Sequence, residues 1–411
     1  MHDPRCACDR WSGRPIGLSS DSRVRERLVT ESRWDADRSL DILDRVGANP
    51  AFAATPARYL PRAQFSIELD KRVEEYFLVG RLSKRDLPQM YLKSGIVIAW
   101  CALSYLGLLH ASTLWQGVVF SVSLGLAMAA VGFNVMHDGN HGAYSRHAWI
   151  NKVMARSLDL LGGSAYFWRF KHNIAHHTYT NISGQDDDIR LGILGRLSPH
   201  DPWHRFYRFQ HIYIWGLYAL LALEWQITGE LRNLISNRRT GMTHVPFPGR
   251  WEHMLFWAGK VVFFGLAFAL PLVIHPLRSV LACYAISAIT LGATLGIVFQ
   301  LAHCVEEAHF EQPPTEHAVV DREWAAHQIE STVDFAPQSR LVTWYVGGLN
   351  YQIEHHLFPR ICHLHYPALA PIVESVCLKY GVRHFTHPTI GSAVRSHARW
   401  LRRMGRAPSA L

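Results

Sequence analysis

The sequence predicts an all-α integral membrane protein, with four transmembrane helices in two hairpins and a cytosolic helical cap. Three observations indicate this fold class: two long apolar regions almost without charge, a low share of charged residues, and histidine clusters just outside the apolar regions. Of 411 residues, 49% are hydrophobic and 18% are charged. The formal charge of +9 does not indicate nucleic acid binding, because Lys and Arg are dispersed rather than gathered in a basic stripe.

The first hairpin is predicted from residues 94–136, which contain no Lys, Arg, Asp or Glu. This length is about twice the ~20 residues that one membrane span requires. A turn near the HAST sequence at 110–113 divides the region into spans at about 94–112 and 114–136.

The second hairpin is predicted from residues 261–303, where Arg278 is the one charged residue and lies in the turn. The expected spans are about 256–275 and 279–302. Between the hairpins, residues 209–223 are apolar but too short for a typical span, so we expect them to be interfacial or buried. If they do not cross the membrane, all the histidine clusters lie on one side of it.

The remaining positive charge indicates the orientation and the domain limits. Loops rich in Lys and Arg favour the cytosolic side, so both termini and the histidine clusters are expected there. We expect a flexible Arg-rich tail at 1–60, a membrane and cap domain at 61–390, and a basic C-terminal tail at 391–411. The N-terminus has no apolar core of a secretory signal, and the seven cysteines lack a C-x-x-C pair, so neither a cleaved signal nor a disulfide framework is expected.

Histidine is frequent, with 25 residues, and three clusters have short spacings. They read HDGNH at 137–141, HNIAHH at 172–177 and QIEHH at 352–356. Residues four apart on a helix share a face, so such pairs can hold one ion together. The candidate metal ligands are His137, His141, His172, His176, His177, His303, His355 and His356.

Eight imidazoles are too many for one ion and suit two. A structural zinc ion takes four ligands and a catalytic one three. Imidazole binds zinc, copper, iron or nickel, so the ligand type alone leaves the metal open. The HExxH sequence of zinc proteases is absent, and Glu306 with His309 is the one clear Glu-x-x-His pair, which excludes the soluble carboxylate di-iron proteins.

At these boxes the sequence resembles the membrane fatty acid desaturases, whose pattern is H-x(3–4)-H, H-x(2–3)-H-H and [HQ]-x-x-H-H. The resemblance covers about residues 64–390 and includes GGLNYQIEHHLFPRICHLHYPAL at 347–369. It implies a di-iron centre in a cytosolic cap, with His303 as an additional ligand. Gln352 at the start of the third box resembles front-end desaturases. The HPGG sequence of a fused cytochrome b5 domain is absent, which implies a separate electron donor such as ferredoxin or cytochrome b5 with its reductase.

The resemblance implies an O2-dependent oxidoreductase that introduces a cis double bond into a long acyl chain carried by coenzyme A or a membrane lipid. Two iron ions (Fe2+/Fe3+) would supply the redox chemistry that side chains cannot. Gln352, Asp138 and Asn140 are expected to act in catalysis, Gln352 near one iron without a firm bond. Asp138 and Asn140, with Asp186, Asp187 and Asp188, are candidates to orient the imidazoles. The expected walls of the substrate tunnel are Trp168, Phe167, Trp324 and Trp344.

Two other functions stay open at the level of the sequence. A membrane di-iron hydroxylase of alkanes, sterols or carotenoids would share the histidine boxes and would make an alcohol. A metal transporter would also need histidines, but transporters place polar ligands near the bilayer midplane. Here the boxes lie outside the apolar runs, which disfavours transport.

Overall fold

The computed structural model describes residues 57–236, 245–312 and 319–407, and most of them are helical. Most of the predicted tail at 1–60 therefore lies outside the described residues. Two small parallel sheets accompany the helices: β1 (Arg58–Leu60) pairs with β2 (Val319–Glu323), and β3 (Asp334–Phe335) pairs with β4 (Thr386–His387). Both sheets join segments that are far apart in the chain.

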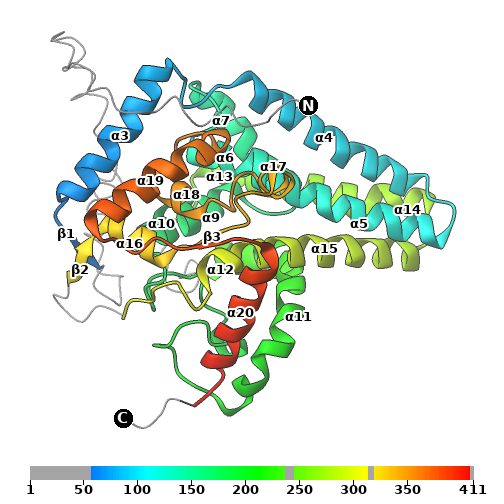
Figure 1. Cartoon of the computed structure of the whole chain (residues 1–411). Helices are drawn as coiled ribbons and strands as arrows, with labels where there is room; N and C mark the ends of the chain where they lie inside the picture. Colours follow the sequence, from blue (N-terminus) through cyan, green and yellow to red (C-terminus); the bar gives the residue numbers. More distant parts are fainter. Residues whose placement is uncertain (1–56, 237–244, 313–318, 408–411) are drawn as a thin grey trace, which may run out of the picture. The chain divides into compact units, whose positions relative to one another are not determined.

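The helices follow one another along the chain as Figure 1 shows. Those before the second apolar region are α3 (Gln64–Gly80), α4 (Pro88–Leu109), α5 (Leu114–Val131), α6 (His137–His141), α7 (Ala148–Ala155), α8 (Ser157–Leu160), α9 (Ala165–Trp168), α10 (His177–Tyr179), α11 (Gln210–Leu223) and α12 (Glu230–Ser236). The others are α13 (Arg250–Phe264), α14 (Leu270–Ile274), α15 (Leu277–His303), α16 (Trp324–Ser331), α17 (Arg340–Tyr345), α18 (Gln352–Leu357), α19 (Tyr366–Tyr380) and α20 (Ile390–Met404).

Four helical segments of the described chain are long and apolar enough to cross a membrane. They are Pro88–Leu109, Leu114–His141, Arg250–Ile274 and Leu277–His303. Thr113 begins the second of them with a capping box that includes Gln116. This reciprocal pair satisfies backbone donors at the helix start, so it fixes where the chain turns.

Helix α15 packs closely between α5 and α11 because glycines remove side chains from the contacts. A Cβ on Gly125 of α5 would lie 2.6 Å from the Ser287 carbonyl oxygen, and one on Gly292 would lie 2.6 Å from the Ala219 carbonyl oxygen. Neither distance is compatible with a real side chain. The histidine at the end of α15 is thus carried on a helix that is held firmly on two sides.

The stretch at 209–223 forms most of α11, which is not one of the four candidate spans. It buries Ile214, Tyr218 and Ala222 against α15 and its neighbours. It then continues through a π-helical turn, Glu224–Gly229, into α12.

The basic segment after residue 390 contains a helix with two different faces. Helix α20 buries Trp400, Leu401 and Met404 in a cluster with Ile214 and Val305. Its arginines lie on the exposed side. Figure 1 shows α20 beside α11, close to where α15 ends.

Candidate metal centre

Helix ends and π-helical turns bring the three histidine boxes and His303 together. The first box is α6, which follows a π-helical turn at Gly132–Met136. The second box ends a π-helical segment, Arg169–His176, and enters α10. The third box lies in α18, and His303 is the last residue of α15. Wide helical turns of this kind are frequent at functional sites.

The eight imidazoles form one buried cluster. Each of the eight histidines is at most 7% exposed. Ligating nitrogens lie within 4.8 Å of one another in a first group, His137, His141, His172 and His355, and in a second group, His176, His303 and His356. His177 joins them, since its ring centroid lies 4.7 Å from that of His141 and 4.3 Å from that of His356. This arrangement offers two adjacent ion positions.

The nitrogen atoms of the cluster fit metal ions. Nε2 of His141, His176, His355 and His356 has no hydrogen-bond partner, although each atom is buried. Buried polar atoms nearly always have a partner, so several unpaired nitrogens that face one space indicate a ligand. An all-imidazole set suits a transition metal and does not suit Mg²⁺ or Ca²⁺, which prefer oxygen.

The environment favours the neutral form of most of the clustered imidazoles, which is the form that binds metal. Burial lowers the pKa of His172, His177, His355 and His356 well below the ordinary value, and the charges of neighbouring histidines add to this shift. His176 differs. Burial lowers its pKa, but the carboxylates of Asp186 and Asp188 together more than offset this effect, so the pKa is raised.

Carboxylate and amide oxygens orient the second group from outside. His176 Nδ1 donates to Asp186, at 3.0 Å from Oδ2, and the backbone N–H of Asn181 donates to the same oxygen at 2.9 Å. His356 Nδ1 donates to Gln328 Oε1 at 2.8 Å. With Nδ1 engaged in this way, Nε2 of both rings points toward the shared space.

A chain of charged and polar groups supports the first group. His363 Nδ1 donates to Asp138 Oδ2 at 2.9 Å, and Asp138 Oδ1 lies 3.7 Å from His137 Nδ1. On its other side, His363 Nε2 accepts from Lys93 Nζ at 2.8 Å. Lys93 is 4% exposed and its Nζ lies 5.5 Å from the centroid of the Trp344 ring. Helix α4 is therefore joined to the metal centre through buried polar contacts.

The expected orienting residues have different surroundings. Asp138 and Asp186 contact histidines directly, and Asp188 Oδ2 lies 3.6 Å from His172 Nδ1. No hydrogen bond joins the Asn140 side chain to a histidine in the described chain; its backbone carbonyl accepts from Asn173 instead. The Asn140 amide Nδ2 is buried without a partner, and its orienting role stays a prediction.

Gln352 lies beside the second group. Its Nε2 is 2.9 Å from His303 Nε2, and the residue is 3% exposed. The amide thus lies next to one ion position. The first two boxes begin with a histidine, whereas the third begins with this glutamine. Whether it bonds to the ion stays a prediction.

The four aromatic residues predicted to line the tunnel lie in different places. Trp168 stacks on His172 with centroids 4.2 Å apart, so it lies at the centre. Trp324 donates to the His177 carbonyl oxygen at 3.2 Å, and Trp344 packs on Lys93. Phe167 packs on Phe256 in a separate cluster. The role of Phe167 in a tunnel wall stays a prediction.

Several contacts of the site were not predicted from the sequence, namely those of Lys93, Phe299, Gln328, His363 and Tyr366. Phe299 lies one helical turn before His303, with ring centroids 4.7 Å apart, so its spacing could have indicated it. Lys93 stands immediately before the first charge-free run, and this position gave no indication of its role.

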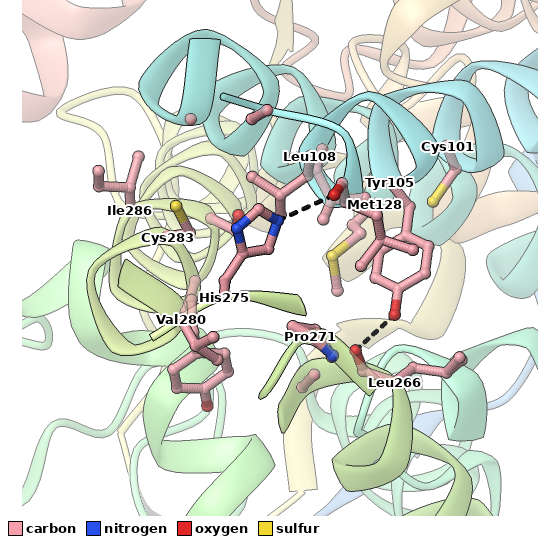
Figure 2. Close-up of a pocket in the computed structure, with 18 of the residues that line it drawn as sticks. Cys101, Tyr105, Leu108, Met128, Leu266, Pro271, His275, Val280, Cys283 and Ile286 are labelled. Carbon is pink, nitrogen blue, oxygen red and sulfur yellow. Dashed lines mark hydrogen bonds between the residues drawn. The ribbon is translucent and has the colours of Figure 1, made fainter. Parts of the chain in front are cut away.

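An apolar cavity of about 660 Å³ lies among the membrane helices. Figure 2 shows side chains of Cys101, Met128, Leu266 and Ile286 around it. Two hydrogen bonds link its walls: Tyr105 OH donates to the Leu266 carbonyl oxygen, and His275 Nε2 donates to the Leu109 carbonyl oxygen. None of the four predicted aromatic residues lines this cavity. Among the lining residues, Val131 is closest in sequence to the first box.

Comparison with known proteins identifies the family. Residues 113–388 match the family model described as fatty acid desaturase. The chain is 38% identical to the sn-1 linoleoyl-lipid 6-desaturase of Arthrospira platensis, over 84% of this chain and 93% of the relative. It is 37% identical to the enzyme of the same name from Synechocystis sp., over 85% and 98%. An acyl-lipid (8-3)-desaturase from Physcomitrium patens is 35% identical over 83% and 72%.

The matched region includes all three histidine boxes and His303, and the buried imidazole cluster lies within it. The chain therefore belongs to the fatty acid desaturase family, and it is an oxidoreductase of lipid metabolism.

Proposed function

We propose that the protein is an O2-dependent acyl-lipid desaturase of the front-end type, which places a cis double bond between an existing one and the carboxyl end. The single observation that best supports the proposed redox activity is the convergence of eight buried imidazoles into two adjacent groups with unpaired nitrogens. Gln352 in the third box supports the front-end type, as do the names of the relatives, which include linoleoyl-lipid 6-desaturases.

The residues present fit two iron ions. His137, His141, His172 and His355 would hold one, His176, His303 and His356 would hold the other, and His177 lies within reach of both. Iron with O2 supplies an oxidant strong enough to remove hydrogen from an unactivated methylene, whereas zinc has no redox chemistry. Asp138, Asp186 and Gln328 hold the rings in place from outside.

The protein's own side chains exclude water from this chemistry and position the acyl chain. The imidazole cluster is closed by Trp168 and Phe299, whose rings pack directly on the histidines. We assign the methyl end of the acyl chain to the apolar cavity, whose volume of about 660 Å³ lies in the range of small-molecule sites. Polar groups are few on its wall, which suits a hydrocarbon.

The membrane arrangement belongs to the same proposal. The four apolar segments form two hairpins, with spans at about 94–112, 114–136, 256–275 and 279–302. The cap and both termini face the cytosol, because the predicted non-cytosolic turns carry Arg278 as their one charged residue. Electrons come from a separate protein.

The test is product analysis in a host that makes linoleoyl lipids. We expect lipid mass spectrometry with double-bond localisation to find a new double bond on the carboxyl side of the existing ones. The variant His355→Ala should make none, whereas His110→Ala, at an exposed turn, should match the unaltered chain. A hydroxylated acyl chain, or a new bond on the methyl side, would overturn the proposal.

A further inference from the structure

Helix α20 carries a row of arginines on one side. The spacing of Arg395, Arg399, Arg402 and Arg403 places them on a common face of α20, Arg406 follows two residues after its last residue, and all five are exposed. The opposite side of the helix is buried. We call these five residues the arginine face.

Much of this positive charge is not neutralised nearby. Glu306 pairs with both Arg399 and Arg403, at 2.8 Å from the Arg403 Nη2. No carboxylate of the described chain forms a salt bridge with Arg395, Arg402 or Arg406. The arginine face is thus a cationic surface, and such a surface attracts an acidic partner.

The same helix packs against the end of α15, which carries His303. His397, on the buried side of α20, donates from Nδ1 to the Cys304 carbonyl oxygen at 2.6 Å. Cys304 follows His303, whose nitrogen belongs to the second group. An α-helix with its side chains is about 10 Å across, so about one helix thickness separates the arginine face from Cys304, the residue after His303.

The composition of the face favours a protein over a membrane surface. Helices that bind in the lipid interface expose large apolar side chains beside their basic ones. On α20, Ile390 is the one large hydrophobic residue that is strongly exposed, and it lies at the first position of the helix. Between it and Met404 the exposed surface is mainly arginine.

We propose that the arginine face is the docking surface for an acidic one-electron carrier protein, which reduces the metal centre from the side of His303. This inference rests on the proposed function. Each docking event oxidises one carrier and transfers one electron. Two docking events supply two electrons, and water supplies two protons. Together with the two hydrogen atoms removed from the acyl chain, they convert one O2 into two water molecules as the carbon–carbon double bond forms.

The experiment compares reductants in the purified, iron-loaded full chain with acyl-lipid substrate. One variant is Arg395→Glu with Arg402→Glu. The matched control is Lys71→Glu with Lys152→Glu, an equal change of charge at exposed positions on α3 and α7. Product formation is driven in parallel by a plant-type ferredoxin with its reductase, by soluble cytochrome b5 with its reductase, and by dithionite.

We expect the arginine variant to lower kcat/KM for the active carrier at least tenfold at low salt, with the dithionite-driven yield unchanged and the control unaffected. High salt should reduce the difference in kcat/KM between the unaltered chain and the arginine variant, because salt screens the attraction between the arginine face and the acidic carrier. The proposal is overturned if the arginine variant loses as much product formation with dithionite as with the carrier, or if it loses no more than the control does. It is also overturned if the unaltered protein forms product with dithionite and with neither carrier. It is also overturned if the variant loses only binding to anionic vesicles. No product with any reductant would instead contradict the proposed function.

Discussion

The two histidine groups use the same ligand type in different surroundings. The first group has four imidazoles, and behind it lies the chain from Asp138 through His363 to the cationic Lys93. The second group has three imidazoles, an amide from Gln352 where a further ring could stand, and the buried carboxylate of Asp186. The second ion position is thus the one with fewer imidazoles, so we expect substitutions beside it to change its metal affinity most readily.

The largest expected effect comes from the ring that borders both positions. His355 belongs to the first group and also forms a group with His177 and His356. His355→Ala should abolish desaturation and lower the iron content, since ligand nitrogens at both positions are disturbed. Metal analysis of the purified variant beside His110→Ala checks this. A full complement of iron in the His355 variant would show that the ring is not a ligand.

A smaller effect, confined to the second group, is expected from Asp186→Asn. The amide cannot hold the His176 imidazole as the carboxylate does, and changes of this kind typically cost 10–100-fold in metal affinity or activity. Titration with iron under anaerobic conditions should show one weakened site and one unchanged site. Equal weakening of both sites would mean that the two groups do not act separately.

The first group should respond to His363→Ala through the loss of the Asp138 contact. We expect about tenfold weaker iron binding at the first site, since His137 loses the support behind it. His363→Gln, which can still donate to Asp138, should recover part of this loss. If both variants bind iron as tightly as the unaltered chain does, His363 has no positioning role.

The smallest change tests Gln352. Gln352→His would place a further imidazole beside His303, and we expect severalfold tighter binding at the second position with altered activity. The absorption spectrum of the iron-loaded variant should differ from that of the unaltered chain. An unchanged spectrum and unchanged affinity would indicate that the residue at 352 stays clear of the ion.

The comparison also shows what could be predicted from the sequence. The four apolar segments and the histidine boxes were identified from composition and spacing, because both are local properties of the chain. The site around them was predicted only in part. Asp138 and Asp186 were named as orienting residues and do contact histidines, whereas no hydrogen bond in the described chain joins the Asn140 side chain to a histidine. Phe167, beside Trp168 in sequence, packs in a different cluster.

By itself the sequence determined that the first histidine box and His303 adjoin the apolar segments, that the other two boxes lie outside them, and that the spacings within the boxes let neighbouring rings point the same way. Only the tertiary structure decided which rings share an ion position, that Lys93 and His363 support one group, and that α20 lies behind His303. The physical reason is that helical periodicity orders residues within one or two turns. Contacts such as that between Lys93 and His363, 270 residues apart, depend on how whole helices pack.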